Sequence, residues 1–250
     1  MIQAVELEAW CDARLAPENF SDYCPNGLQV EGRRPIRRLA SGVTASRALI
    51  DAAVAWDADA ILVHHGYFWR GEPEPLRGMK GDRIRTLMQN DISLLAYHLP
   101  LDAHPEYGNN ASLGRLLAIS DAEATESGAG LLWRGRLEMS MDPESFASHI
   151  GEALERAPLH IACDRPGIDT VGWCTGGAQK FIEDAADLGL DAYISGEVSE
   201  STYHAAIERN IHYYAAGHHA TERYGVQALA EAAASELGLE HRYFELDNPV

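Results

Sequence analysis

Two pairs of adjacent histidines are the side chains in this sequence best suited to chemistry. They are His64-His65 and His218-His219, and a carboxylate accompanies each pair: Asp102 stands four residues after His98, and Glu222 four residues after His218. Imidazole and carboxylate ligands suit zinc, iron, manganese or nickel and do not choose among them. The strongest candidate ligands are therefore His64, His65, Asp102, His218 and Glu222. His98 and His219 are weaker candidates.

The first histidine pair favours two metal ions rather than one. Neighbouring side chains on a strand point to opposite faces, so His64 and His65 reach one site only if the chain leaves strand geometry at Gly66, or if each binds a different ion. Two ions about 3.5–4 Å apart, joined by shared carboxylates, activate water and polarise a carbonyl or phosphoryl oxygen. We therefore expect two divalent metal ions per chain.

Simpler roles exist for the same residues. A histidine pair at a strand end can hydrogen-bond loop carbonyls, Asp102 can cap a helix or turn before Pro105, and Glu222 can pair with Arg223 on a solvated face. Two pairs, each after an expected strand and each with a suitably placed carboxylate, favour the metal interpretation.

The first candidate ligands follow the strands of a βαβ unit. The pattern predicts a strand at 39–43, a helix at 45–56 with Thr44 as its N-cap, and a buried strand at 60–63. A helix at 81–90 and a strand at 92–97 follow. In parallel sheets ligands collect at the carboxyl ends of the strands, where these side chains fall.

The same pattern returns in the second part of the chain. Residues 36–66 align, with one gap, on residues 168–197, and 92–102 correspond to 211–222 with the same spacing from histidine to acid. An internal duplication explains this, because each copy is a unit whose apolar face needs covering. The fold class is therefore α/β with two related halves, 1–125 and 126–250, and the C-terminal helix can cross this boundary.

The remaining segments carry weaker signals. We expect a helix at 2–16, a linker or surface loop at 120–130, an edge strand at 131–139, a helix at 143–153 and a strand at 159–163. Asp22 and Asn26 are either polar contacts or caps of their own turn, and we favour the caps. Thr175-Gly176-Gly177 weakly resembles a phosphate-binding turn. Glu197 is either a base or partner lining the site, or a carboxylate at a helix N-terminus.

Composition excludes several classes of function. A formal charge of −18 repels a phosphate backbone, so nucleic-acid binding is not expected. No apolar run approaches the roughly 20 residues that span a bilayer. The four cysteines form no CxxC pair, which indicates a reducing, cytoplasmic setting.

Motifs along almost the whole chain carry a family resemblance. They are SDYCPNGLQVEG, GVTAS, ILVHHGYFWRGE, YHLPLDAHPEYGNNA, WCTGGAQKFI, DAYISGEVSE and AAGHHATERYG. Together they resemble the Nif-three-like dinuclear metal-centre family, whose members are named GTP cyclohydrolase 1 type 2 homologues. The resemblance implies three-layer α/β/α halves, a ring-shaped homohexamer and two metal ions at His64, His65, Asp102, His218 and Glu222.

Three functions compete at this stage. The first is a metal-dependent hydrolase acting on a small polar substrate such as a nucleotide. The second is a non-enzymatic, metal-dependent regulator or adaptor that acts as a ring-shaped homo-oligomer. The third is metal storage or delivery. The sequence names neither the metal nor the substrate nor a physiological partner.

Overall fold

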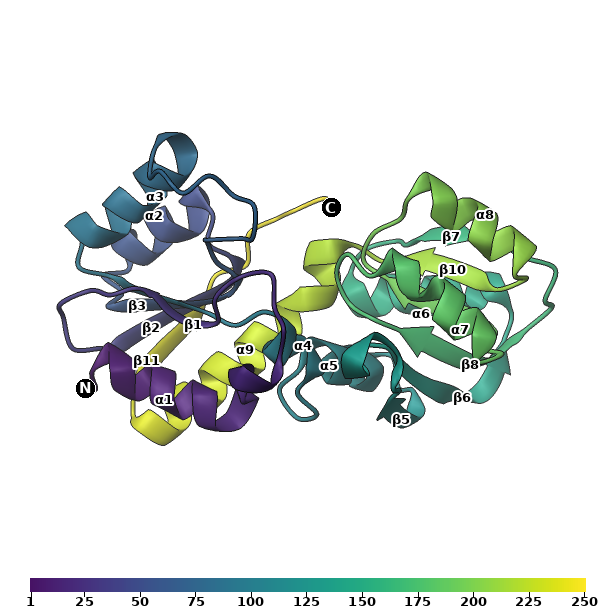
Figure 1. Ribbon diagram of the computed structural model, residues 1–250. Coiled ribbons are helices and arrows are strands. Elements are labelled where there is room, and N and C mark those ends of the chain that lie inside the picture. Colours follow the sequence, from purple (N-terminus) through teal and green to yellow (C-terminus); the bar gives the residue numbers. More distant parts are fainter. The chain divides into compact units, whose positions relative to one another are not determined.

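The chain forms two compact α/β units, shown in the ribbon diagram of Figure 1. The computed structural model describes residues 1–250. Unit 1 comprises Met1–Leu101 with Gly225–Asp247, and unit 2 comprises Asp102–Tyr224 with Asn248–Val250. The expected α/β class with two related halves is confirmed. None of the helices combines the length and the apolar character that a membrane span requires.

Unit 1 is built on a five-stranded sheet of order β1-β4-β3-β2-β11. Strand β1 is antiparallel to β4, and the other neighbouring strands are parallel. The strands are β1 (Gly27–Val30), β2 (Arg38–Thr44), β3 (Ala60–His65), β4 (Ser93–Ala96) and β11 (Glu240–Tyr243). The helices are α1 (Ala4–Leu15), α2 (Arg47–Ala55) and α3 (Gly78–Gln89), together with most of α9 (His218–Leu237).

Helices cover both faces of this sheet. Helices α2 and α3 lie on one side, and α1 and α9 on the other (Figure 1). Ile61 and Val63 of β3 pack in one core cluster with Leu49 of α2 and Leu87 of α3. Leu62, whose side chain points to the opposite face, is also fully buried. This burial on both faces explains why β3 is a continuous apolar run.

Unit 2 is built on a six-stranded sheet of order β5-β6-β8-β9-β10-β7. Strands β8, β9 and β10 are parallel, and the flanking pairs are antiparallel. The strands are β5 (Ser120–Ala124), β6 (Trp133–Met141), β7 (Leu159–Ile161), β8 (Ile168–Trp173), β9 (Ala192–Ser195) and β10 (His212–Ala215). The helices are α5 (Asn109–Leu116), α6 (Pro143–Leu154), α7 (Ile182–Asp187) and α8 (Glu200–Glu208); α4 (Leu99–Ala103) spans the division between the units.

Unit 2 also has three layers. Phe146 of α6 and Ile194 of β9 belong to one core cluster, whereas Tyr193 of β9 and Ala206 of α8 belong to a second cluster. Consecutive residues of β9 therefore face different helices, as alternation along a strand requires. The order β2-β3-β4 in unit 1 corresponds to β8-β9-β10 in unit 2, in agreement with the expected duplication.

Three local expectations need correction. Residues 120–130 are not a linker, because they contain β5, which pairs with β6. Strand β6 is therefore not an edge strand, since β5 and β8 flank it. The N-cap of α2 is Ser46, whose side chain accepts a hydrogen bond from the Leu49 N–H; Thr44 still belongs to β2.

Candidate metal centre

His64 and His65 end strand β3 in unit 1. Their rings lie side by side, with centroids 4.5 Å apart. His64 is fully buried, and its Nδ1 donates to the Tyr97 carbonyl at 2.9 Å, which fixes the tautomer that carries the lone pair on Nε2. His65 Nδ1 shares a 3.2 Å hydrogen bond with the Thr44 hydroxyl. Both rings are thus held through Nδ1.

Gly66, the residue after the pair, has no room for a side chain. A Cβ there would lie 2.2 Å from Gln29 Oε1 and 2.6 Å from Ala96 Cβ. Gln29 Oε1 in turn accepts a hydrogen bond from the Tyr67 N–H at 2.7 Å. The glycine therefore lets the chain turn closely past β1 and β4 immediately after the two imidazoles.

His218 and Glu222 lie one turn apart at the start of α9 in unit 2. Their spacing predicted this, and the distance from His218 Nε2 to Glu222 Oε2 is 3.1 Å. His218 Nδ1 donates to Glu197 Oε1 at 2.7 Å. Of the two roles considered for Glu197, the structure therefore supports that of a partner which orients a candidate ligand.

The two carboxylates set the protonation of His218. Burial would lower the pKa of this imidazole, but the hydrogen bonds and charges of Glu222 and Glu197 outweigh burial and raise the pKa to about 9. In the metal-free chain the ring is therefore an imidazolium at neutral pH. A metal ion that binds Nε2 must displace this proton.

Asp102 is the second buried carboxylate of unit 2. Its Oδ1 accepts a hydrogen bond from Asn109 Nδ2 at 2.8 Å and one from the Thr175 hydroxyl at 3.4 Å. A carboxylate oxygen of Asp102 lies within 4.8 Å of one of Glu222. Two carboxylates this close in a buried place repel each other, and a cation between them relieves the repulsion.

Gly176 makes room for Glu222. A Cβ at this position would lie 2.0 Å from Glu222 Oε1 and 3.1 Å from His218 Nε2, and the backbone has a positive φ of 66°. The turn that weakly resembled a phosphate site is therefore shaped around a carboxylate. Thr175, its first residue, bonds to Asp102.

The donor chemistry of both units fits a borderline divalent metal. Unit 1 offers imidazole nitrogens, and unit 2 offers two carboxylates and an imidazole, a set that suits zinc, iron, manganese or nickel. Cys24 lies near Asp22 and His98, but burial and the charge of Asp22 raise the pKa of its thiol to about 12. It therefore stays protonated, whereas metals bind the thiolate.

Asp22 and Asn26 do more than cap their own turn, because both also contact His98, which is distant in the sequence. Asp22 does accept from the N–H of its neighbour Tyr23, at 2.6 Å, but the same Oδ1 also lies 2.7 Å from His98 Nδ1. Asn26 Oδ1 accepts from the His98 N–H at 2.7 Å. Sequence spacing gave no signal for these contacts, because more than 70 residues separate the partners.

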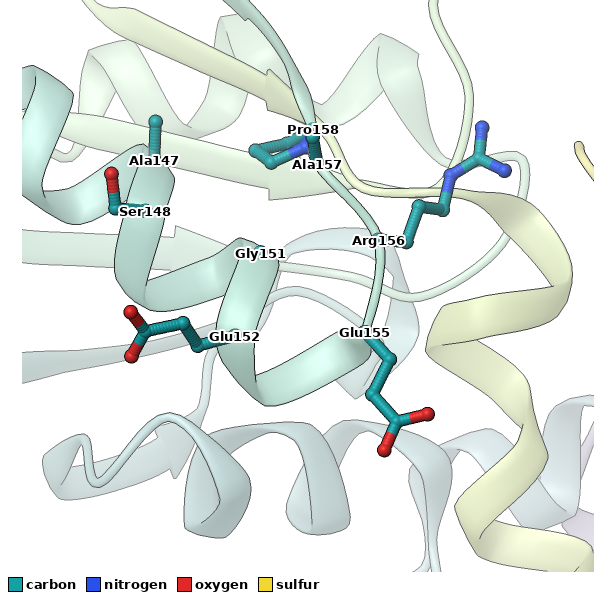
Figure 2. Close-up of a pocket in the computed structure, with 8 residues that line it drawn as sticks. All are labelled: Ala147, Ser148, Gly151, Glu152, Glu155, Arg156, Ala157 and Pro158. Carbon is teal, nitrogen blue, oxygen red and sulfur yellow. The ribbon is translucent and has the colours of Figure 1, made fainter.

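A shallow hollow of about 460 Å³ lies elsewhere in unit 2, at the end of α6 (Figure 2). Figure 2 shows the side chains of Glu152 and Arg156 pointing in different directions. The Arg156 guanidinium donates to the Pro249 carbonyl. The lining contains none of the expected ligands; it consists of Ala147, Ser148, Gly151, Glu152, Glu155, Arg156, Ala157 and Pro158.

The five expected ligands divide between the two units. His64 and His65 come together in unit 1, and Asp102, His218 and Glu222 come together in unit 2. That both groups serve the same ions stays a prediction. His219 is buried beside His218, and its N–H donates to the Val250 carbonyl at 3.1 Å.

Fold and donor set together define an α/β protein with candidate metal ligands in each half. The profile of the Duf34/NIF3 (NGG1p interacting factor 3) family matches residues 2–249, and the chain belongs to this family. A "GTP cyclohydrolase 1 type 2 homolog" of Allochromatium vinosum is 57% identical over 250 residues, covering 100% of this chain and 98% of that protein. The protein of the same name from Vibrio cholerae is 54% identical, covering 98% and 99%.

Solved structures of relatives have the same fold. The structure described as "protein ybgI, unknown function" superposes with a TM-score of 0.96 at 47% identity, covering 100% of both chains. A protein from Thermus thermophilus, TTHA1606, gives a TM-score of 0.90 at 32% identity, again over 100% of both chains.

Proposed function

We propose that this protein is a metal-dependent hydrolase with two divalent metal ions per chain, bound by His64, His65, Asp102, His218 and Glu222. The observation that carries the proposal is the arrangement in unit 2, where Gly176 leaves space for the Glu222 carboxylate beside His218. Core packing does not account for this space, because it holds a buried carboxylate rather than an apolar side chain. The name of the relatives supports hydrolytic chemistry.

The proposed ligands and their hydrogen-bond partners have different roles. His64 and His65 would supply ring nitrogens, and Asp102 and Glu222 would supply two negative charges that offset part of the charge of two divalent ions. Glu197 orients His218, as the Tyr97 carbonyl orients His64. When bound, a pair of ions activates water and polarises the bond under attack. A nucleotide is the substrate class that we propose, and GTP is the first compound to test.

Metal content and turnover test the proposal together. Elemental analysis of gently purified protein should give two equivalents of metal per chain. Metal-loaded protein should hydrolyse GTP, and the double variant His64→Ala, Glu222→Ala should not. A matched double variant, His204→Ala, Glu231→Ala, changes an exposed histidine and an exposed glutamate and should keep the wild-type rate. Equal rates in all three proteins would exclude the hydrolase.

A regulator or adaptor is the second candidate, because the family description names an interacting factor. This function predicts two bound metal ions, no turnover of nucleotides, and a melting temperature that falls when a chelator removes the ions. Metal storage would instead show weak affinity and rapid exchange with the chelator.

We also propose a ring-shaped homohexamer, which the family resemblance supports. Light scattering coupled to size-exclusion chromatography should give six times the chain mass of 27.4 kDa. A monomer mass in the metal-loaded protein would contradict the ring.

A further inference from the structure

Two solvent-accessible aromatic side chains, Tyr23 and Trp69, lie beside the histidines of unit 1. The Trp69 ring centroid lies 6.0 Å from that of His65 and 5.0 Å from that of His98. The Tyr23 ring centroid lies 6.3 Å from that of His98. Single exposed aromatic residues are common on protein surfaces, but a pair of them next to candidate metal ligands indicates a binding surface.

Both aromatic rings keep surface that a ligand can contact. Each meets His98 in a steep arrangement, with interplanar angles of 64° for Tyr23 and 85° for Trp69. These contacts cover only part of each ring, because Tyr23 is still 57% exposed and Trp69 is half-buried. The uncovered surface is suited to a planar group, since aromatic rings attract one another in stacked or perpendicular arrangements.

Hydrogen bonds hold the two rings in place before any ligand binds. The Trp69 indole N–H donates to the Gly66 carbonyl at 3.2 Å, and the Arg70 N–H donates to the Tyr23 carbonyl at 2.7 Å. The Arg70 guanidinium donates to the Asp22 carbonyl at 2.8 Å. These bonds join two segments that are far apart in the sequence, so less conformational entropy is lost when a ligand settles on the rings.

Arg70 also brings a positive charge to this surface. Its guanidinium carbon lies 5.8 Å from the Tyr23 ring centroid, and the side chain is exposed. The chain as a whole carries a formal charge of −18, which repels anions, so an anionic ligand needs a local cation. A nucleotide matches this chemistry, because it joins a planar base to an anionic phosphate.

We propose that Tyr23 and Trp69 bind the base of a nucleotide by stacking, beside the candidate metal ligands of unit 1. This inference rests on the proposed function, since it names the residues that recognise the proposed substrate class. Every base has a π-face, so stacking distinguishes a nucleotide from a bare sugar phosphate and discriminates little among bases. Tyr23 and Trp69 therefore determine specificity without ligating a metal.

A comparison of GMP with ribose 5-phosphate tests the stacking site. The two compounds share a sugar and a phosphate, so the ratio of their affinities for metal-loaded protein, measured by equilibrium dialysis, reports the contribution of the base. Wild-type protein should bind GMP at least about fivefold more tightly. Trp69→Leu should bind GMP about 5- to 150-fold more weakly than wild type, and should keep its affinity for ribose 5-phosphate.

Matched variants show whether the aromatic ring itself is responsible. Trp69→Phe keeps a ring and should retain most of the affinity for GMP, whereas Tyr23→Leu should weaken GMP binding alone. Tyr203→Leu is the control, because Tyr203 is 54% exposed, much like Tyr23, and belongs to α8 of unit 2. It should bind both compounds as wild type does.

Three results would overturn the stacking site while leaving the proposed hydrolase in place. They are equal affinities of wild-type protein for the two compounds, a GMP affinity of Trp69→Leu equal to that of Tyr203→Leu, and a parallel loss of both compounds and of bound metal in Trp69→Leu. Conversely, wild-type protein that prefers GMP but hydrolyses no GTP would remove the hydrolase and keep the stacking site. Circular dichroism checks folding; should Trp69→Leu not fold, Tyr23→Leu decides, because its side chain is mostly exposed.

Discussion

The two units place different chemistry on the same scaffold. In unit 1 the ends of β3 and β4 present three imidazoles, whereas in unit 2 Asp102 of α4 and the start of α9 present two carboxylates and an imidazole. The orienting partners vary as well: a carbonyl holds His64, whereas carboxylates hold His98 in unit 1 and His218 in unit 2. The parallel strands therefore fix where ligands gather, and the residues after each strand decide their charge.

The largest expected effect tests the carboxylate side of this comparison. Gly176→Ala should weaken metal binding by more than about 100-fold, because the new methyl group must displace Glu222 Oε1 from 2.0 Å. The positive φ adds about 1–2 kcal/mol of instability. Isothermal titration and thermal melting measure the two effects.

Gly189→Ala provides the control for that variant. Gly189 also has a positive φ, of 74°, but a Cβ there would contact nothing within 4 Å. It should lose similar stability and keep its metal affinity. Equal metal affinity in both variants would show that the space at Gly176 does not serve Glu222.

The next effect concerns the partner of His218. Glu197→Gln should weaken metal binding by about 10- to 100-fold, because the ring loses the carboxylate that orients Nδ1 and raises its basicity. Titration of chelator-stripped protein measures the change. If Glu197→Gln bound metal with unaltered affinity, Glu197 would act only as a carboxylate at the N-terminus of α8.

The pH dependence follows from the same imidazole. The pKa of His218 is raised to about 9 from an ordinary 6.5, so its charge stabilises the metal-free fold fully below about pH 6.5. That stability is lost as the pH rises through about 9. The pH dependence of metal affinity has the opposite sign, because metal binding releases the proton of His218. Metal affinity should therefore rise about tenfold per pH unit up to about pH 9.

Calorimetry in buffers of different ionisation enthalpy counts the released proton. Melting temperatures of the metal-free protein between pH 6 and 10 test the stability term. Metal binding without proton release at pH 7 would contradict the charged state of His218.

The smallest expected effect on metal binding concerns Thr44, the uncharged hydrogen-bond partner of His65 in unit 1. Thr44→Val should weaken metal binding by less than about tenfold, because a hydrogen bond between uncharged groups contributes about 0.5–1.5 kcal/mol. The same titration measures it. A loss as large as that of Glu197→Gln would remove the proposed distinction between neutral and charged partners.

The sequence predicted those parts of the fold that leave a local pattern. Strand β3 was visible because it is buried on both faces, and the pair His218 and Glu222 because four residues make one helical turn. Strand β5 was missed because most of its residues are exposed, so no apolar alternation marks it. The partner of Asp22 could not be identified, because His98 is distant in the chain.

The buried thiol of Cys24 allows the turn at 22–26 to be observed directly. With its pKa raised to about 12, the thiol reacts with an alkylating reagent only after the turn opens to solvent. The rate at which Cys24 is alkylated thus reports the opening of this turn without an introduced label. A ligand that binds only the closed turn would slow that reaction, so an ordinary cysteine can record binding beside the turn.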